Sequence, residues 1–243
     1  MTNGALRAPG SRTIIITGAG RGLGLGLATC FAERGDRVIG AARTPESVAE
    51  LADVADRVVA LDVASDASIA AAVDALADLD RIDVLINNAG IDGRAVGAAG
   101  GARGSMEMGR AHFLAVMDIN AAGPLLVTQG FAPLLRKAGG ALVVNISSQL
   151  GAMTFGHQAG NDIAYNASKA ALNMVTVRTA TELEPDEIGV VAVHPGWVRT
   201  DMGGSSASLG VEQSASAIAA TVDGLTLADS GRFLRWDGTT HDW

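Results

Sequence analysis

Thr17-Gly18-Ala19-Gly20-Arg21-Gly22-Leu23-Gly24 follows an apolar run and precedes a long helical pattern, and this stretch decides the fold. The apolar run, Thr13 to Thr17, is typical of a buried strand, and the pattern from about Gly22 to Arg34 predicts a helix. A glycine-rich turn lets the backbone approach a phosphate group, which the free N–H groups of the helix N-terminus attract. The spacing is G-x-x-x-G-x-G rather than G-x-G-x-x-G, so in a chain with 31 glycines it gains its meaning from its surroundings.

The same order of strand and helix recurs along the whole chain. Further strands are predicted at Arg37–Ala42, Arg57–Leu61, Val84–Ile86, Ala141–Ile146, Gly189–Val193 and Arg232–Arg235. Further helices are predicted at Pro45–Val54, Ser65–Leu79, Met108–Lys137, Ala164–Leu183 and Val211–Gly224, and surface loops at Asp92–Gly104, Ala152–Ile163 and Gly203–Gly210. This alternation predicts an α/β protein with a Rossmann-type, doubly wound parallel sheet of about seven strands and helices on both faces. No linker divides residues 12–243, which are expected to form one domain after a loose tail, residues 1–11.

Composition excludes several classes of protein. The chain has 243 residues, is 48% hydrophobic and carries 18 basic against 26 acidic residues, a net charge of −8, so a nucleic-acid groove or an anionic membrane surface is a poor partner. The single cysteine, Cys30, cannot form an internal disulfide, and the four histidines lack ligand spacing, so no metal is expected. We expect no apolar run of the about 18 residues that a spanning helix needs and no secretory leader, and hence a cytoplasmic protein.

The end of the second predicted strand bears on the choice of nucleotide. A site that prefers NAD places an acid there to bind the ribose 2′-hydroxyl, but this strand ends in Ala42-Arg43, and Asp36 lies before it. Arg43 and Arg21 can hold a 2′-phosphate by charge-assisted hydrogen bonds. The sequence therefore favours NADP(H) over NAD(H).

Tyr165 and Lys169 form the candidate catalytic pair. They are four residues apart on a predicted helix and so share one face. A phenol has a pKa of about 10, which a nearby ammonium lowers, so the tyrosine can serve as a general acid or base. Ser148 ends a buried strand, where ligands bind in open α/β sheets, and its hydroxyl can bond a carbonyl oxygen.

Four motifs in this order resemble the short-chain dehydrogenase/reductase family over nearly the whole chain. They are the glycine loop, Asn87-Asn88-Ala89-Gly90, Ser148 with Tyr165-Asn166-Ala167-Ser168-Lys169, and Pro195-Gly196. Within the family the chain is most similar to the carbonyl reductases of the sniffer and C-factor type. That similarity is carried by Ser168–Met174, His194–Gly204 and Trp236–Gly238.

The resemblance implies four catalytic residues. Tyr165 would protonate the carbonyl oxygen, Lys169 would lower its pKa and bind the nicotinamide ribose, and Ser148 would orient the carbonyl. Asn120 would hold a water that connects Lys169 to solvent. The segment between Ser148 and Tyr165 is longer than in most members, as it is in the sniffer-like group, and Ser147 is a neighbouring candidate for the serine position.

The resemblance also implies a set of cofactor-binding residues, with Asp62 at the adenine and Val198 and Thr200 at the carboxamide. The set is Gly18, Gly20, Arg21, Gly22, Leu23, Arg43, Asp62, Val63, Asn88, Ala89, Gly90, Tyr165, Lys169, Pro195, Gly196, Val198 and Thr200. The substrate candidates flank the predicted cleft and are Met153, His157, Trp197 and Met202.

The first function expected is NADPH-dependent reduction of a ketone, aldehyde or quinone carbonyl to an alcohol. One alternative is a 3-oxoacyl carrier-protein or thioester reductase, or a biosynthetic alcohol dehydrogenase; the carrier-protein version needs a basic docking patch, for which Arg94, Arg103 and Arg110 are the candidates. Another is a nucleotide-binding signalling protein with little turnover. The resemblance implies a homodimer or homotetramer that pairs the helices around Ala111–Lys137 and Ala164–Leu183. Substrate identity depends on the loops and stays open.

Overall fold

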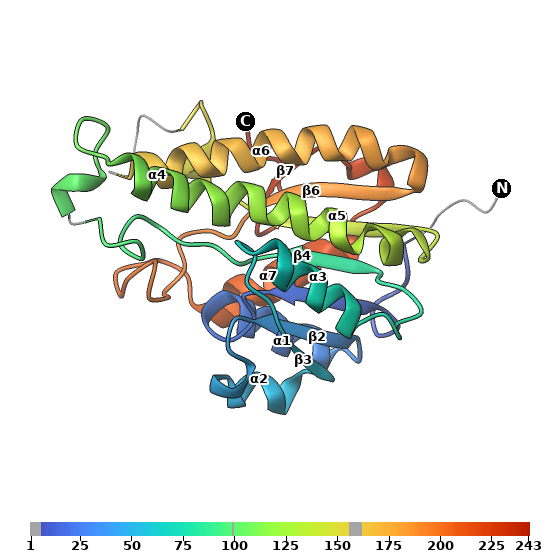
Figure 1. Cartoon of the computed structure of the whole chain (residues 1–243). Helices are drawn as coiled ribbons and strands as arrows, with labels where there is room; N and C mark the ends of the chain where they lie inside the picture. Colours follow the sequence, from blue (N-terminus) through green and yellow to red (C-terminus); the bar gives the residue numbers. More distant parts are fainter. Residues whose placement is uncertain (1–5, 99, 156–161) are drawn as a thin grey trace.

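The computed structural model describes residues 6–98, 100–155 and 162–243 and contains a seven-stranded parallel sheet (Figure 1). Its strands are β1 (Thr13–Thr17), β2 (Arg37–Ala42), β3 (Arg57–Ala60), β4 (Val84–Asn87), β5 (Ala141–Ile146), β6 (Ile188–His194) and β7 (Phe233–Arg235). Their order across the sheet is β3-β2-β1-β4-β5-β6-β7, with every pair of neighbours parallel. The predicted α/β class and doubly wound sheet are confirmed.

Helices cover both faces of this sheet. They are α1 (Gly22–Glu33), α2 (Ala49–Val54), α3 (Asp66–Ala75), α4 (Arg110–Met117), α5 (Gly123–Arg136), α6 (Ile163–Leu183) and α7 (Val211–Gly224). Helices α1 and α7 pack on one face, and α3, α5 and α6 pack on the other (Figure 1). The predicted helix at Pro45–Val54 divides into a 3-10 turn at Pro45–Ser47 and the shorter α2, and the one predicted at Ser65–Leu79 ends at Ala75.

The predicted helix at Met108–Lys137 is one continuous run in three parts. A five-residue π-helical turn, Asp118–Ala122, joins α4 to α5. Among the described residues, the run Arg110–Arg136 is long and apolar enough to cross a membrane by length and composition alone, so the expectation that no stretch reaches that limit was wrong. Its apolarity has another use here, because Val127, Phe131 and Leu135 are fully buried against the sheet.

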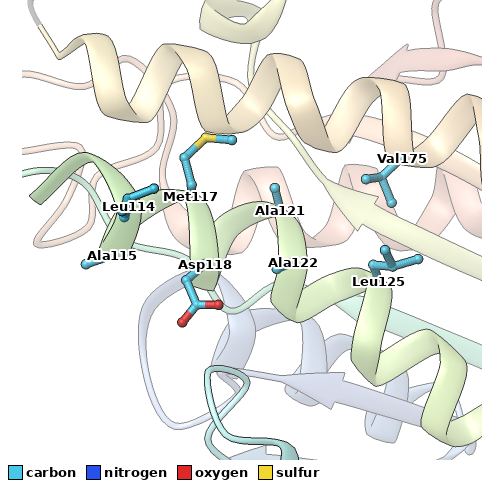
Figure 2. Close-up of a pocket in the computed structure, with 8 residues that line it drawn as sticks. All are labelled: Leu114, Ala115, Met117, Asp118, Ala121, Ala122, Leu125 and Val175. Carbon is cyan, nitrogen blue, oxygen red and sulfur yellow. The ribbon is translucent and has the colours of Figure 1, made fainter. Parts of the chain in front are cut away.

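The outer side of this run borders an open groove of about 580 Å³ beside α6 (Figure 2). The groove is lined by Leu114, Ala115, Met117, Asp118, Ala121, Ala122, Leu125 and Val175. Figure 2 shows Met117 and Ala121 directed toward α6 and Val175 directed back toward α5. Asp118 is the one charged residue in this lining, so the groove is an apolar surface between helices.

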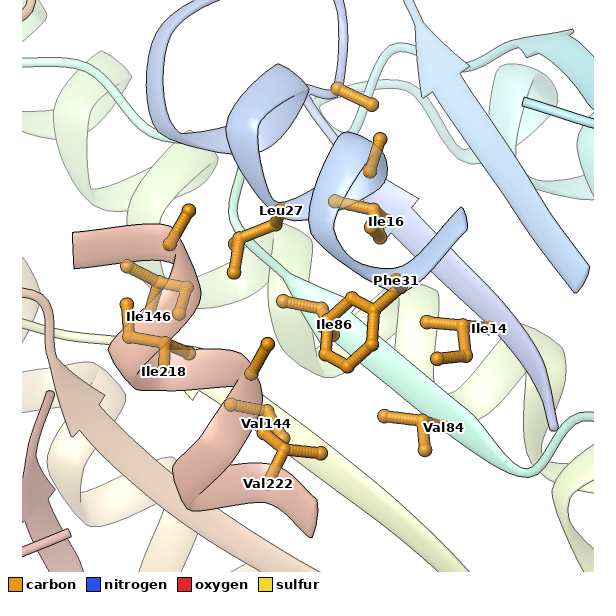
Figure 3. Close-up of a cluster of buried hydrophobic side chains, with 14 of the residues drawn as sticks. Ile14, Ile16, Leu27, Phe31, Val84, Ile86, Val144, Ile146, Ile218 and Val222 are labelled. Atoms are coloured by element: carbon orange, nitrogen blue, oxygen red, sulfur yellow. The ribbon is translucent and has the colours of Figure 1, made fainter. Parts of the chain in front are cut away.

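The strands are buried on both faces, which is why two helical layers are required. Ile14 and Ile16 of β1 point into the cluster formed with Leu27 and Phe31 of α1 and with α7 (Figure 3). Ile15, between them, points to the opposite cluster with α3, α5 and α6. Successive side chains of a strand alternate between faces, so a near-continuous apolar run supplies both cores.

Part of the predicted N-terminal tail is attached to the sheet. Arg7 Nε lies 3.0 Å from Asp83 Oδ1, and the Gly10 N–H donates to Asp36 Oδ1 at 2.8 Å. Residues 1–5 lie outside the described residues. The looseness expected of residues 1–11 therefore does not extend to Arg7 and Gly10.

The strand order positions the functional site. The chain builds outward from β1 to β3 and then crosses back to β4 beside β1, so the segments that leave β1 and β4 diverge. Such a reversal opens a crevice at the carboxyl ends of the strands, where ligands bind in open α/β sheets. The glycine loop follows β1, Asn88 follows β4, Ser148 follows β5 and Pro195 follows β6.

Candidate active site

The glycine loop has the backbone geometry of a phosphate cradle. Gly18 and Gly22 have φ angles of +63° and +54°, in the left-handed region that favours glycine. A Cβ on Gly24 would lie 2.3 Å from the Gly18 carbonyl oxygen, so a side chain has no space there. Helix α1 begins without a side-chain cap, which leaves its first N–H groups for an anion. These features fit the pyrophosphate of a dinucleotide.

Thr17 and Asn88 hold this loop against the end of β4. Thr17 Oγ1 accepts the N–H groups of Asn88 (3.0 Å) and Ala89 (3.1 Å), and Asn88 Nδ2 donates to the carbonyl oxygens of Thr17 (2.9 Å) and Gly18 (3.1 Å). The Asn88 side chain thus holds the backbone of the glycine loop in place through the carbonyl groups of Thr17 and Gly18. Sequence reasoning did not assign Thr17 a role, although its place at the end of β1 was the available signal.

The predicted 2′-phosphate ligands lie at the surface of the crevice. Arg43 is exposed directly after β2, and Arg21, whose side chain is 77% exposed, forms an ion pair with Asp201 in the loop after β6. Sequence reasoning missed Asp201, which lies 180 residues away along the chain. Asp62 follows β3 and accepts the Ala64 N–H at 3.1 Å, and Val63 is buried beside Gly123.

Tyr165 and Lys169 meet at the carboxyl end of β5. Lys169 is buried, its Nζ donates to the Ile146 carbonyl oxygen at 2.8 Å and lies 5.8 Å from the Tyr165 ring centre. Burial lowers the pKa of Lys169 to about 8. Burial raises the pKa of Tyr165 to about 12; a hydrogen bond with Ser148 opposes this, and the charges of Asp92 and Asp162 add to it. The sequence led us to expect that Lys169 lowers the tyrosine pKa, but burial raises this pKa and Lys169 is not among the groups that shift it, so the phenol keeps its proton near neutral pH.

Two neighbouring serines take different roles. Ser147 Oγ donates to Asn173 Oδ1 in α6 at 2.6 Å and is buried. Ser148 accepts the Leu150 N–H at 3.1 Å and also forms the hydrogen bond with Tyr165. Of the two candidates, the structure brings Ser148 to the tyrosine and leaves Ser147 bound to the helix behind it.

Asn120 lies in the π-helical turn and is fully buried. Its Oδ1 accepts the Ile91 N–H (2.8 Å), and its Nδ2 donates to the Ile91 carbonyl oxygen (2.7 Å) and to Ser168 Oγ (2.9 Å). A Cβ on Gly90 would lie 3.2 Å from Asn120 Oδ1 and 3.6 Å from Lys169 Nζ, so these residues surround one small region. Such turns occur frequently at functional sites.

The loop after β6 closes the crevice from the side. The Pro195 carbonyl oxygen accepts Ser214 Oγ–H at 2.6 Å, and Gly196 has a φ of +82°. Val198 is buried, and the Thr200 methyl group would lie 3.3 Å from a Cβ on Gly22. The loop therefore touches the glycine loop, as the predicted cofactor set requires.

The described substrate candidates come from two loops at this edge. Met153 is 81% exposed after β5, while Trp197 and Met202 are 52% and 39% exposed after β6. Trp197 Nε1 donates to the Gly203 carbonyl oxygen at 2.8 Å, which fixes the indole. His157 lies outside the described residues. The loop rim thus presents large apolar side chains to solvent.

No group of three or more His, Cys, Asp or Glu side chains in the part of the chain that the structure describes could hold a metal ion. The apolar groove of Figure 2 contains none of the four predicted catalytic residues, although Asn120 is next to its lining residue Ala121. The groove is therefore a surface feature outside the catalytic crevice.

A nucleotide cradle, a switch-point crevice and a Ser–Tyr–Lys group together define a class of dinucleotide-dependent oxidoreductases. A family model described as short chain dehydrogenase matches residues 12–208. The chain belongs to the short-chain dehydrogenase/reductase family and is an oxidoreductase, which confirms the predicted family.

Individual relatives agree with this assignment. The chain superposes on the NADPH-bound carbonyl reductase from chicken fatty liver with a TM-score of 0.86 and 32% identity, covering 96% of this chain and 99% of that one. The carbonyl reductase Sniffer of D. melanogaster gives a TM-score of 0.86, 33% identity and the same coverage of each chain, 96% and 99%. A protein named C-signal from Myxococcus xanthus is 40% identical over 162 residues, which are 67% of this chain and 93% of that protein.

Proposed function

We propose that the protein reduces a ketone, aldehyde or quinone carbonyl to an alcohol with NADPH. The observation that carries this proposal is the meeting of Tyr165, Ser148 and Lys169 beside the cradle, with the Tyr165 pKa raised to about 12. A bound nicotinamide supplies a hydride to the carbonyl carbon. The Tyr165 hydroxyl then delivers its proton to the carbonyl oxygen, which balances the reduction.

The other residues orient the reactants. The Ser148 hydroxyl, beside Tyr165, binds the carbonyl oxygen and fixes its direction. Lys169 holds the ribose hydroxyls with the protons of Nζ that the Ile146 carbonyl oxygen does not use. Asn120 fixes the wall around Lys169, where a water would connect the amine to solvent.

The preference for NADP(H) rests on charge. Asp36 is buried in an ion pair with Arg12, 2.5 Å apart, and so cannot serve as the acid that binds a free ribose. Arg21 in the glycine loop and Arg43 directly after β2 are both exposed, and their guanidinium groups would bind the 2′-phosphate. The NADPH-bound chicken enzyme supports the same preference.

Two alternative functions remain to be weighed, a carrier-protein reductase and a signalling protein. A carrier-protein substrate needs a free basic patch, but Arg94 pairs with Asp92 (2.5 Å) and an Arg103 guanidinium nitrogen lies 3.9 Å from an Asp162 carboxylate oxygen. Of the three candidates only Arg110 has no ion pair among the described residues, and one arginine is a small patch, which disfavours that substrate. The second alternative is a nucleotide-binding signalling protein with little turnover, and the support for its signalling part is the name of the relative C-signal. Catalysis through Tyr165 separates this alternative from the first proposal.

We also propose a homodimer in the cytoplasm. Helices α4, α5 and α6 leave the apolar groove open, and Leu114 at its edge is 54% exposed. A second copy can cover the same surface with its own helices, as a self-complementary contact requires. Sedimentation of the wild type and of Leu114→Arg tests this: the variant should sediment as a monomer, and an unchanged size would contradict the proposal.

The function is tested by following NADPH oxidation, with NADH in parallel, across diketones, quinones, aldehydes and acyl thioesters. Wild type should turn over simple carbonyls with NADPH, and Tyr165→Phe should lose about 10²- to 10⁴-fold of the rate. Binding of NADPH without any turnover, or equal activity of the variant, would overturn the catalytic assignment. Turnover of thioesters alone would favour the carrier-protein alternative.

A further inference from the structure

Asp162 joins the catalytic helix to the loop that follows β4. It directly precedes α6, is 8% exposed, and its Oδ1 accepts the Tyr165 N–H at 3.1 Å as a helix cap. Its Oδ2 accepts the Gly93 N–H at 2.8 Å. One carboxylate therefore contacts the backbone of the catalytic tyrosine and the backbone of a loop 69 residues away.

Capping alone does not account for a carboxylate here. Serine, threonine or asparagine caps a helix about equally well, and burying a charge is unfavourable unless it is paired and hydrogen-bonded. The second oxygen is used by Gly93, and the nearest cation, Arg103, is 3.9 Å away. Asp162 thus has one more acceptor oxygen than a helix cap needs, and this second oxygen binds the loop at Gly93.

Gly93 is suited to this contact by its missing side chain. A Cβ on Gly93 would lie 2.8 Å from Asp162 Oδ2 and 3.2 Å from Arg103 Cγ. Either the carboxylate or the loop would have to move to accept it. The close approach therefore depends on glycine at 93 as well as on the acid at 162.

The Asp162–Gly93 contact is connected through Arg94 to the loop after β6, which carries the substrate candidates Trp197 and Met202. Arg94, next to Gly93, pairs with Asp92 and donates from Nη2 to the Met202 carbonyl oxygen at 2.6 Å. Met202 lies in the loop after β6, with Trp197 at its start. A chain of bonds thus leads from the first turn of α6, through residues 92–94, to the loop that closes the crevice.

We propose that Asp162 is a positioning residue that sets Tyr165 and the rim loop at residues 92–94 in one fixed arrangement around the substrate. This inference rests on the proposed reductase function, because it assigns the geometry of the same site. Loss of the Gly93 bond releases the rim from the catalytic helix, which weakens substrate binding more than it slows the proton transfer.

The charge of Asp162 also affects the Tyr165 pKa, so the pH dependence of the reaction is a second measurement that tests the proposal. Among the residues that the structure describes, the charged groups near the phenol are Asp92 and Arg94 in the loop after β4, Arg103 beyond it, Asp162, and Lys169 on α6. Asp92 and Asp162 both raise the pKa of Tyr165. Neutralising Asp162 lowers that pKa, so the reduction rate, which needs the protonated phenol, declines at a lower pH than in wild type.

Three variants separate the two contacts. Asp162→Asn keeps an oxygen for the Tyr165 N–H but presents an amide N–H to Gly93, where no acceptor remains. Asp162→Ser keeps only the cap. Gly93→Ala leaves the carboxylate and its charge in place and disturbs the same contact from the loop side. Circular dichroism and thermal unfolding establish that each variant is folded.

We expect the KM for the carbonyl substrate to rise about 10- to 100-fold in all three variants, with a smaller fall in kcat and an unchanged Kd for NADPH. The basic limb of the pH profile should move to lower pH in Asp162→Asn and stay in place in Gly93→Ala.

Amide hydrogen exchange in residues 92–97 should accelerate in the Asp162 variants. This readout needs no turnover, so it tests the contact even if the reductase function fails. A folded Asp162→Asn enzyme with wild-type KM, pH profile and exchange would overturn the proposal.

Discussion

The two ends of the sheet use buried carboxylates in opposite ways. At the amino end, Asp36 accepts four hydrogen bonds, from the N–H groups of Gly10 and Arg12 and from two nitrogens of the Arg12 guanidinium, which also lies over Phe31. At the carboxyl end, Asp162 accepts two backbone N–H groups, and its nearest cation is 3.9 Å away. Of these two buried carboxylates, Asp36 is closely paired with a cation, whereas Asp162 beside the crevice is held mainly by backbone N–H groups.

The acid–base groups follow the same division. Lys169 and Tyr165, whose pKa values are moved to about 8 and about 12, both lie at the carboxyl end. Strong shifts of this kind mark functional sites with a stated physical cause. The comparison therefore predicts that changes at the amino end alter stability alone, whereas changes at the carboxyl end alter activity.

The largest stability effect is expected at the amino end. Asp36→Ala leaves the buried Arg12 guanidinium with Asp223, 2.8 Å away, as its remaining partner, and should lower the free energy of unfolding by about 3 kcal/mol, the lower end of the range for breaking a buried pair. The folded fraction should keep the wild-type kcat, because Asp36 is remote from the crevice. Urea unfolding followed by circular dichroism measures the loss, with the exposed Asp53→Ala as the matched control, expected within about 0.5 kcal/mol of wild type.

At the carboxyl end, removal of a charge should stabilise the fold and abolish activity. Burial lowers the pKa of Lys169 from 10.5 to about 8, so below pH 8 the folded state holds a charge that the unfolded state solvates better. The shift corresponds to about 3 kcal/mol at pH 7, and loss of the hydrogen bond to the Ile146 carbonyl oxygen offsets about 1 kcal/mol, so Lys169→Met should raise the free energy of unfolding by about 2 kcal/mol.

The lowered pKa of Lys169 determines how the stability gain of Lys169→Met changes with pH. Between about pH 8 and 10.5 the wild-type lysine loses its proton on folding, so the stability of wild type rises and the advantage of Lys169→Met shrinks. Urea titrations at pH 7 and pH 10 measure both. An equal gain in the free energy of unfolding at the two pH values would contradict a lysine whose charged form is destabilised by burial.

The smallest effect is expected at the exposed pair between Arg21 and Asp201. Both side chains are largely exposed, so the pair itself contributes little stability. Asp201→Asn releases Arg21 for the 2′-phosphate and should tighten NADPH binding about two- to fivefold. NADH serves as the control ligand in the same fluorescence titration, and equal tightening of both nucleotides would show that Arg21 does not read the phosphate.

Local sequence patterns predicted the sheet well because each strand is a short apolar run between turn residues. All seven strands and the helices α1, α6 and α7 lie within a residue or so of where the pattern placed them, whereas the bounds of α2 and α3 and the π-helical turn at Asp118–Ala122 were missed. Sequence periodicity does not show a single extra residue in a helical turn, because the apolar pattern continues through it. The long run also passed the length limit for a membrane helix, since burial on the sheet demands the same apolar residues.

Motifs likewise located Ser148, Tyr165 and Lys169, which the fold brings together at one strand end. Thr17 and Asp201 were not assigned, and Asp162 was expected only in a loop beside the active site, because their partners lie about 70 to 180 residues away and depend on how loops meet. The choice between Ser147 and Ser148 also needed the structure, since only the direction of each side chain decides it. Contacts between loops are the part of the site that one sequence does not contain.

The most direct test of the account is a single-turnover reaction with NADPH deuterated at the position that donates the hydride. Mass spectrometry of the alcohol formed from a simple ketone measures deuterium at the former carbonyl carbon for wild type and Tyr165→Phe. We predict one deuterium per molecule of alcohol with wild type and a rate about 10²- to 10⁴-fold lower with the variant. Absence of deuterium in the product, or equal rates for the two proteins, would contradict it.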